Sequence, residues 1–274
     1  MKSGLLCSEH KRPSLFLAAG NMVRLFGNEY NITNPTLTSH TKSTKANENE
    51  EGWEAMIGVI RVLTTEDTKV LEQHGKLLEQ TYGLPVVSKC IPDQPLGIYD
   101  GETEAVAVPK IVELGKRMES EGCKVLIISC AADPAIEPLR ESVSVPVIGA
   151  GSAAAYAALS MGRPVGVLGI TEEAPAVIRD LLGDKLVRYE RPEGVTNTTD
   201  LMTPAGREKA VEAARSLLDA GTKVIVFACT GFSTIGLAAV LRSELHVPVV
   251  DAVEAEGLFA SHYFKQLDDV REPN

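Results

Sequence analysis

Two cysteines, Cys130 and Cys229, stand in contexts that suit acid/base chemistry, because each ends one copy of a repeated apolar run. The copies are residues 122 to 130 (GCKVLIISC) and residues 221 to 229 (GTKVIVFAC). A single cysteine at the end of a buried strand is usually a small core residue. Two at the same position of a repeat indicate a shared role, so we interpret them as two thiols that act as a pair.

Both cysteines precede residues that favour the start of a helix. After the first cysteine, Asp133 is a good N-cap residue and Pro134 a good first helical residue. After the second, Thr230 or Ser233 can cap the next helix. The positive end of a helix favours a thiolate, so we expect both thiols to have a pKa below the ordinary value of about 8.5.

Two thiols on opposite sides of one cleft suit the inversion of a carbon acid stereocentre. The reaction removes a proton from one face of the carbon and delivers a proton to the other face, which a thiolate and a thiol do symmetrically. Backbone N–H groups at the two helix starts would hold the developing enolate oxygen. The sequence has neither a P-loop nor a clustered set of metal ligands, so we expect no cofactor and no metal.

The repeat extends along the chain and predicts the elements that must position the cysteines. Apolar runs alternate with helical patterns in both copies, which indicates parallel strands joined by crossover helices. The expected strands cover residues 57 to 63, 85 to 90, 124 to 129, 145 to 148, 164 to 170, 185 to 190, 223 to 228 and 247 to 250. The expected helices cover residues 66 to 80, 103 to 120, 134 to 142, 151 to 161, 172 to 182, 204 to 219, 233 to 244 and 252 to 266.

We therefore expect an α/β fold with two pseudo-symmetric lobes, each a four-stranded parallel sheet flanked by helices. Lobe 1 comprises residues 56 to 155 and lobe 2 residues 156 to 251, and the C-terminal helix at 252 to 274 is expected to pack back on lobe 1. Ligands of open α/β sheets bind beyond the carboxyl ends of the strands, so the active cleft is expected between the lobes.

Residues 1 to 55 differ in composition from the rest of the chain. Eleven of the nineteen residues from 31 to 49 are Ser, Thr or Asn, which bury too little apolar surface to offset the entropy of ordering. We expect a disordered N-terminal extension. The sequence leaves open whether it is a targeting leader, a native tail or an extension ahead of a natural start at Met56.

The composition excludes several classes of function. The chain has 274 residues, with 27 Lys and Arg against 37 Asp and Glu, and a net charge of −10. Nucleic acids and anionic membranes are bound through an excess of basic residues, so neither is expected as a partner. The five cysteines are scattered, with no pair spaced for a zinc site or a disulfide framework. We expect a small-molecule substrate and a reducing, cytoplasmic location.

The chain resembles the Asp/Glu/hydantoin racemase superfamily over residues 56 to 274, and most closely its hydantoin racemase branch. The similar motifs are CAADP at 130 to 134, Arg140, VPVIG at 145 to 149 with Ala153 and Ala154, CTG at 229 to 231 and VPVVD at 247 to 251. The family consists of cofactor-independent two-cysteine racemases and epimerases with two pseudo-symmetric lobes. Its members are often oligomeric, so the resemblance also admits a homo-oligomer.

The resemblance implies Cys130 and Cys229 as the acid/base thiols and further residues around the substrate. Backbone or hydroxyl contacts to the substrate are expected from Ala131, Ala132, Thr230 and Gly231. The remaining polar wall, at the first strand ends of the two lobes, is expected from Thr64, Thr65 and Thr171. The loop at 95 to 100, which contains Ile98, is expected to roof the cleft together with residues 194 to 200.

The residues after the first cysteine favour one class of substrate. Amino-acid racemases of the superfamily place Asn-Thr there to hold an α-carboxylate, whereas Ala131 and Ala132 have no polar side chain. Backbone groups can instead hold a neutral cyclic ureide, such as a 5-substituted hydantoin or allantoin. We therefore expect an isomerase that racemises such a ureide by proton transfer between the two thiols.

Alternatives from several classes stay open. An Asp/Glu racemase, a decarboxylase or another isomerase would use the same scaffold, and a bilobal small-molecule binding protein would use it without catalysis. Residues 149 to 154 (GAGSAA) also fit the dinucleotide pattern G-x-G-x-x-G/A, with Glu172 about twenty residues on. This motif follows the fourth strand of its copy, and the second copy lacks it, so we interpret it as tight strand-to-helix packing.

Overall fold

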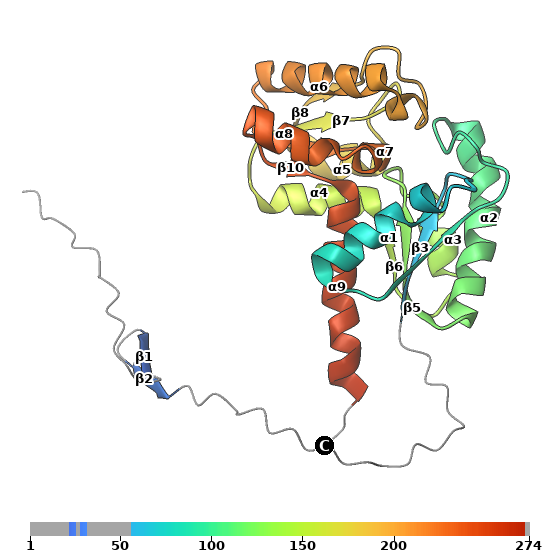
Figure 1. Cartoon of the computed structure of the whole chain (residues 1–274), viewed down its shortest axis with the longest axis vertical. Helices are drawn as coiled ribbons and strands as arrows, with labels where there is room; N and C mark the ends of the chain where they lie inside the picture. Colours follow the sequence, from blue (N-terminus) through green and yellow to red (C-terminus); the bar gives the residue numbers. More distant parts are fainter. Residues whose placement is uncertain (1–21, 26–27, 32–55, 272–274) are drawn as a thin grey trace, which may run out of the picture. The chain divides into compact units, whose positions relative to one another are not determined.

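Two four-stranded sheets, each with all of its strands parallel, make up the centre of the protein (Figure 1). The structure is a computed structural model, and it describes residues 22–25, 28–31 and 56–271. Both sheets lie within one unit of the chain, residues 52 to 274. In the described part of the chain no helix is both long and apolar enough to cross a bilayer.

The two sheets have the same topology. The first has the order β4-β3-β5-β6, with β3 at Met56–Arg61, β4 at Val86–Cys90, β5 at Cys123–Ser129 and β6 at Val147–Gly149. The second has the order β8-β7-β9-β10, with β7 at Val165–Leu168, β8 at Leu186–Glu190, β9 at Val224–Phe227 and β10 at Val249–Val250. This confirms the predicted fold of two pseudo-symmetric lobes, each with a four-stranded parallel sheet.

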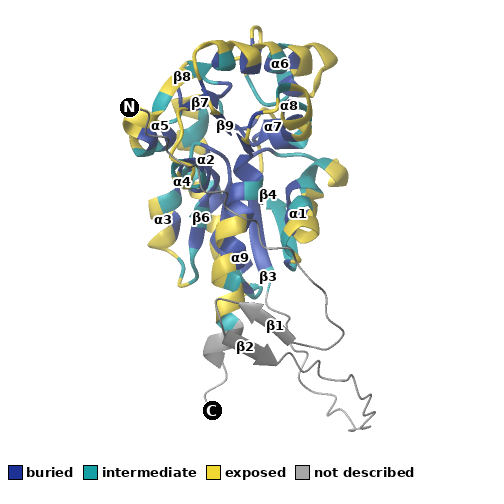
Figure 2. Ribbon diagram, turned by 90° about the vertical axis from the view of Figure 1, so that its left-hand side faces the viewer, coloured by how far each residue is buried: buried dark blue, intermediate teal, exposed yellow. Residues whose placement is uncertain are grey.

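Helices cover both faces of each sheet. The helices after the strands of the first sheet are α1 at Thr68–Tyr82, α2 at Gly101–Ser120, α3 at Ile136–Arg140 and α4 at Ala150–Ser160. Those after the strands of the second are α5 at Ala176–Leu182, α6 at Pro204–Asp219, α7 at Gly231–Thr234, α8 at Leu237–Leu245 and α9 at Ala252–Arg271. Figure 2 shows the buried strands between helices whose outer faces are exposed.

Alternation along the strands divides the apolar side chains between the two faces of a sheet. In β5, Val125 and Ile127 pack toward α1 and α9, whereas Leu126 and Ile128 pack toward α2 and α3. In β9, Val224 and Val226 pack toward α4 and α5, whereas Ile225 and Phe227 pack toward α6 and α8. Strands buried on both faces read as continuous apolar runs, which is why the repeat was visible in the sequence.

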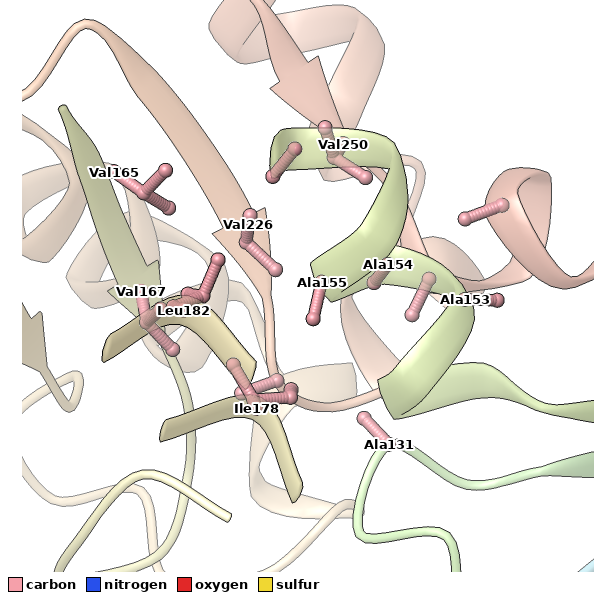
Figure 3. Packing of buried hydrophobic residues seen from close by; sticks show 14 of the residues in the cluster. Ala131, Ala153, Ala154, Ala155, Val165, Val167, Ile178, Leu182, Val226 and Val250 are labelled. Atoms are coloured by element: carbon pink, nitrogen blue, oxygen red, sulfur yellow. The ribbon is translucent and has the colours of Figure 1, made fainter. Parts of the chain in front are cut away.

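The helix that follows each sheet packs on the sheet of the other lobe. Helix α4 follows β6, but its alanines pack against Val165 and Val167 of β7 and Val226 of β9 (Figure 3). Helix α9 follows β10, but its Val253 and Ala260 belong to the apolar cluster of β3, β5 and α1. The division of lobes expected after residue 155 therefore falls inside α4.

Asp133, which we expected to cap the helix after Cys130, caps a different helix. Its carboxylate accepts hydrogen bonds from the N–H groups of Gly151 (2.6 Å) and Ser152 (2.9 Å), at the start of α4. Asp133 itself has a φ of 53°, and Ala135, the residue before α3, has a φ of 57°. These left-handed residues flank Pro134 and delay the start of α3 to residue 136.

The glycines of the segment 149 to 154 make room for this arrangement. A Cβ atom on Gly149 would lie 2.3 Å from the Asp133 carboxyl group, and one on Gly151 would lie 2.1 Å from the Ala131 carbonyl oxygen. The Asp133 carboxylate thus occupies the end of α4 where the pyrophosphate of a dinucleotide would bind. The motif has a packing role in this fold.

Several other elements differ from the sequence expectation; α5, for example, begins at residue 176 and not at 172. The helix expected at 233 to 244 is divided into α7 and α8 by Gly236, which has a φ of 64°. Within the extension expected to be disordered, β1 (Met22–Leu25) and β2 (Asn28–Asn31) pair in antiparallel fashion. The rest of that extension, residues 1–21, 26–27 and 32–55, lies outside the described residues.

Replacing Gly151 with alanine is expected to destabilise the protein by about 1–3 kcal/mol, because the new methyl group would collide with the Ala131 backbone. Urea denaturation of the full chain measures this free energy of unfolding. The matched control is Gly101→Ala in the first turn of α2, where a Cβ atom meets nothing within 4 Å. An unchanged free energy of unfolding in Gly151→Ala would contradict the packing role of this glycine.

Candidate active site

The carboxyl ends of both sheets contribute to one cavity of about 650 Å³. Cys130, directly after β5, and Cys229, two residues after β9, both line it. Strands β5 and β9 are central in their sheets, so the two thiols come from equivalent positions of the two lobes.

Burial dominates the protonation of both thiols. It raises the pKa of Cys130 far above its ordinary value, and the nearby Cys229, Asp133 and Glu104 raise it further, against a hydrogen bond from the Ala132 N–H. Burial also raises the pKa of Cys229, to about 11. Both thiols therefore prefer the neutral form at neutral pH.

Cys229 is the more easily ionised of the two thiols. Its Sγ accepts a hydrogen bond from the Gly231 N–H over 3.3 Å, and the Thr198 hydroxyl and the Phe232 N–H also oppose the increase in its pKa. Cys130 has fewer such donors and more acidic neighbours. The repeat is therefore symmetric in position but not in electrostatics.

The expectation of lowered thiol pKa values was wrong, and the geometry explains why. Helices α3 and α7 have only five and four residues, so their dipoles are small, and neither has a side-chain N-cap. The Thr230 hydroxyl donates instead to the Ser129 carbonyl, and the Ser233 hydroxyl to Asp251. Loss of hydration outweighs the remaining N–H groups.

Most of the residues predicted to contact a substrate lie around this cavity. The lining includes Ile98, Ala131, Ala132, Thr171, Thr230 and Gly231. The hydroxyl of Thr171 already donates to the Glu173 carbonyl over 2.6 Å. Thr171 and Thr230 thus use their hydroxyl protons within the protein, which leaves their oxygen lone pairs as acceptors.

Thr64 and Thr65 lie outside the lining of the cavity. The Thr64 hydroxyl donates to the Ile91 carbonyl (2.6 Å) and accepts from the Gln94 N–H (2.7 Å), and the Thr65 hydroxyl accepts from the Asp67 N–H (3.1 Å). Their side chains shape the turns after β3 and the beginning of the loop over the cavity.

The structure adds charged residues that the sequence analysis did not single out. Arg61 at the end of β3, Glu104 on α2 and Arg191 after β8 all line the cavity. Neither Glu104 nor Arg191 has a side-chain hydrogen bond or ion pair among the described residues. In the sequence they are only charged residues close to a strand end or a helix start. Many solvent-exposed residues fit the same description, so the sequence alone does not distinguish them.

Metal-ligating side chains do not cluster in the described part of the chain. Within residues 22–25, 28–31 and 56–271, no three His, Cys, Asp or Glu side chains stand close enough to hold an ion together.

Comparison with known proteins identifies the family of the chain. The family model "Asp/Glu/Hydantoin racemase" matches residues 45–256. The chain belongs to the Asp/Glu/hydantoin racemase family. Because the family and the curated relatives are racemases, it is an isomerase of the racemase type.

Individual relatives give the extent of the similarity. The hydantoin racemase of Rhizobium meliloti is 31% identical over 171 residues, which are 60% of this chain and 69% of that protein. The hydantoin racemase of Pseudomonas sp. (strain NS671) is 25% identical over 61% of this chain and 68% of its own length. The solved structure of allantoin racemase from Klebsiella pneumoniae shares the fold, with a TM-score of 0.66 and 24% identity over 78% of this chain and 89% of that one.

The raised pKa of this racemase's thiols predicts their reactivity. Because only the thiolate is alkylated, the rate for Cys229 should rise about tenfold per pH unit from pH 7 to 9.5, with Cys130 slower throughout. Iodoacetamide labelling followed by peptide mass spectrometry measures both rates in one sample. A Cys229 rate that levels off below pH 8, or faster labelling of Cys130, would contradict this assignment.

Proposed function

We propose that the protein racemises a 5-substituted hydantoin, or a related cyclic ureide such as allantoin, by proton transfer between Cys229 and Cys130. The observation that carries the proposal is the entry of the two thiols into one cavity from equivalent positions of two facing lobes. A substrate carbon between them has one thiol on each face, which inversion requires.

The proposed reaction uses only the two thiols and the substrate. The Cys229 thiolate takes the proton from the stereocentre, and the electron pair moves into the adjacent carbonyl to form an enolate. The Cys130 thiol then donates its proton to the opposite face. The inverted product leaves with Cys130 as thiolate and Cys229 as thiol, which is the state that accepts the other enantiomer.

Burial of the thiols suits this reaction. A desolvated thiolate with a pKa of about 11 is a stronger base than a solvated one, so it is better matched to a weakly acidic carbon. Because little of that thiolate is present at neutral pH, only a small fraction of the protein is in the reactive form there. We expect turnover to increase with pH through the neutral and mildly alkaline range.

A buried cation supports stabilisation of the enolate. Arg61 lines the cavity, and its Nη1 donates to the carbonyls of Val70 (2.6 Å) and Leu71 (3.1 Å), which fixes the guanidinium. Burial lowers its pKa to about 10, so it keeps its charge at neutral pH. A fixed positive charge beside the cavity would stabilise the negative charge that develops on the substrate.

The charges of the cavity support a neutral ureide over a dicarboxylic amino acid. The acidic lining residues are Asp100, Glu104, Glu172 and Glu173, and the basic ones are Arg61 and Arg191. An aspartate or glutamate substrate would meet this acidic excess, whereas a ureide would not. Its N–H groups match the carboxylate of Glu104, and its C=O groups match the guanidinium of Arg191, neither of which has a side-chain partner among the described residues.

Two-thiol racemisation predicts the behaviour of the single-cysteine variants. Enantiopure 5-substituted hydantoins, allantoin, aspartate and glutamate in D2O are followed by proton NMR and circular dichroism, with a protein-free control for spontaneous exchange. We expect loss of the α-proton signal and of optical activity for a ureide. Cys130→Ser and Cys229→Ser should each slow racemisation by about 10²–10⁴-fold, the usual contribution of one acid/base group.

Other outcomes would select another function. Racemisation confined to aspartate or glutamate would make the protein an amino-acid racemase. Proton retention on every substrate despite binding would favour a decarboxylase or a binding protein. Full racemisation by either cysteine variant would contradict the two-thiol mechanism.

The position of Glu104 in the cavity lining predicts a hydrogen bond from a ring N–H of the ureide to its carboxylate. Loss of a charge-assisted hydrogen bond in Glu104→Gln should increase KM about tenfold with little change in kcat. The effect should vanish with a substrate whose ring nitrogens are methylated. Glu102→Gln, on the same turn of α2 but outside the cavity lining, is the matched control. An equal effect on methylated and unmethylated substrates would contradict this contact.

A further inference from the structure

A ring of hydrogen bonds joins the residues next to the two cysteines. On one side, the Thr230 hydroxyl donates to the Ser129 carbonyl over 3.2 Å. On the other side, His74 bridges two hydroxyls, with its Nδ1 2.8 Å from Ser129 Oγ and its Nε2 3.0 Å from Thr234 Oγ1. The Thr234 N–H donates to the Thr230 carbonyl over 3.3 Å, which closes the ring.

The ring spans both lobes and contains the direct neighbour of each cysteine. Ser129 is the last residue of β5 and precedes Cys130, whereas Thr230 follows Cys229 and leads into α7. His74 belongs to α1 of the first lobe but reaches a side chain of the second. No other described side chain bonds to both cysteine-bearing segments in this way.

Helix α9, which packs on the same face of the first sheet as α1, also contacts the ring. Glu256 is fully buried, and its Oε1 accepts the Ser129 hydroxyl proton over 2.7 Å. When the Ser129 hydroxyl donates to Glu256, its oxygen is free to accept from His74 Nδ1–H, and His74 Nε2 then accepts from the Thr234 hydroxyl. This arrangement uses both ring nitrogens of a neutral imidazole, one as donor and one as acceptor.

Neutrality of the imidazole agrees with its surroundings. His74 is 1% exposed, and burial lowers its pKa well below the ordinary value, with the nearby Arg61 charge acting in the same direction. Burial likewise raises the pKa of Glu256 well above its ordinary value. His74 does not line the cavity of the two thiols, so it acts on the substrate only through its neighbours.

We propose that His74 is a positioning residue that holds Cys130 and Cys229 at the spacing required for proton transfer across a bound substrate. The proposal rests on the proposed racemase function. Removal of one proton needs one thiol in place, whereas inversion needs both in fixed relation. Loss of the bridge should therefore impair inversion more than proton removal.

The test compares deuterium exchange with inversion in D2O. With the ureide that the wild type racemises, His74→Leu should reduce kcat for inversion by about 10–100-fold at similar KM, because small displacements of reacting groups are costly. The ratio of α-proton exchange to inversion should rise about tenfold, because the intermediate is more often reprotonated on its original face. His74→Asn, whose amide keeps a donor near the Nδ1 position, should recover part of the loss.

Two controls separate positioning from stability. Tyr82→Phe removes another hydrogen bond of α1, from the Tyr82 hydroxyl to the Glu254 carbonyl over 2.7 Å, and should leave the exchange-to-inversion ratio unchanged. Thermal denaturation of all variants shows whether the fold is retained. A His74→Leu protein that keeps the wild-type ratio overturns the proposal even if its melting temperature falls.

A second measurement does not depend on the substrate. Amide hydrogen exchange should increase in His74→Leu at both 129–132 and 229–234, but not in Tyr82→Phe. If the wild type exchanges no α-proton on any substrate, the proposed function fails while this measurement still decides whether His74 restrains both cysteine segments. Unchanged protection of either segment would overturn the proposal.

Discussion

The exchange of covering helices between the lobes is the constraint on which the site depends. Helix α4 leaves the first sheet and packs on the second, and α9 does the reverse. One face of each sheet is thus covered partly by a helix of its own half and partly by a helix from the other half. The lobes are therefore fixed relative to one another by their apolar cores, and the thiols at their strand ends inherit that fixed relation.

Burial raises the pKa of both thiols, whereas their position before a helix would by itself lower it. A solvated thiol beside a long helix would ionise readily and be a weak base. Here the cavity and the short α3 and α7 keep both thiols protonated, and the few donors around Cys229 make it the easier of the two to ionise. The asymmetry arises from neighbours such as Glu104 and Thr198, which the repeat does not duplicate.

The sequence predicted the sheets well because strands buried on both faces read as uninterrupted apolar runs. It singled out Cys130 and Cys229 because they share a place in the repeat, and both line the same cavity. It failed for Asp133, whose partner lies eighteen residues away at the start of α4, since local cap statistics cannot register a distant helix. His74 was hidden for the same reason: on a polar helix, only tertiary contacts separate a buried bridging imidazole from a solvated one.

The exchange of helices also has a consequence for a protein that would consist of one half alone. Residues 56 to 160 end with a helix that suits the second sheet and lack the one that covers their own. A half-length protein with this architecture would cover its sheet fully by pairing with another copy and exchanging terminal helices. The connectivity of the present fold is therefore that of two swapped halves within a single polypeptide, with one thiol in each half.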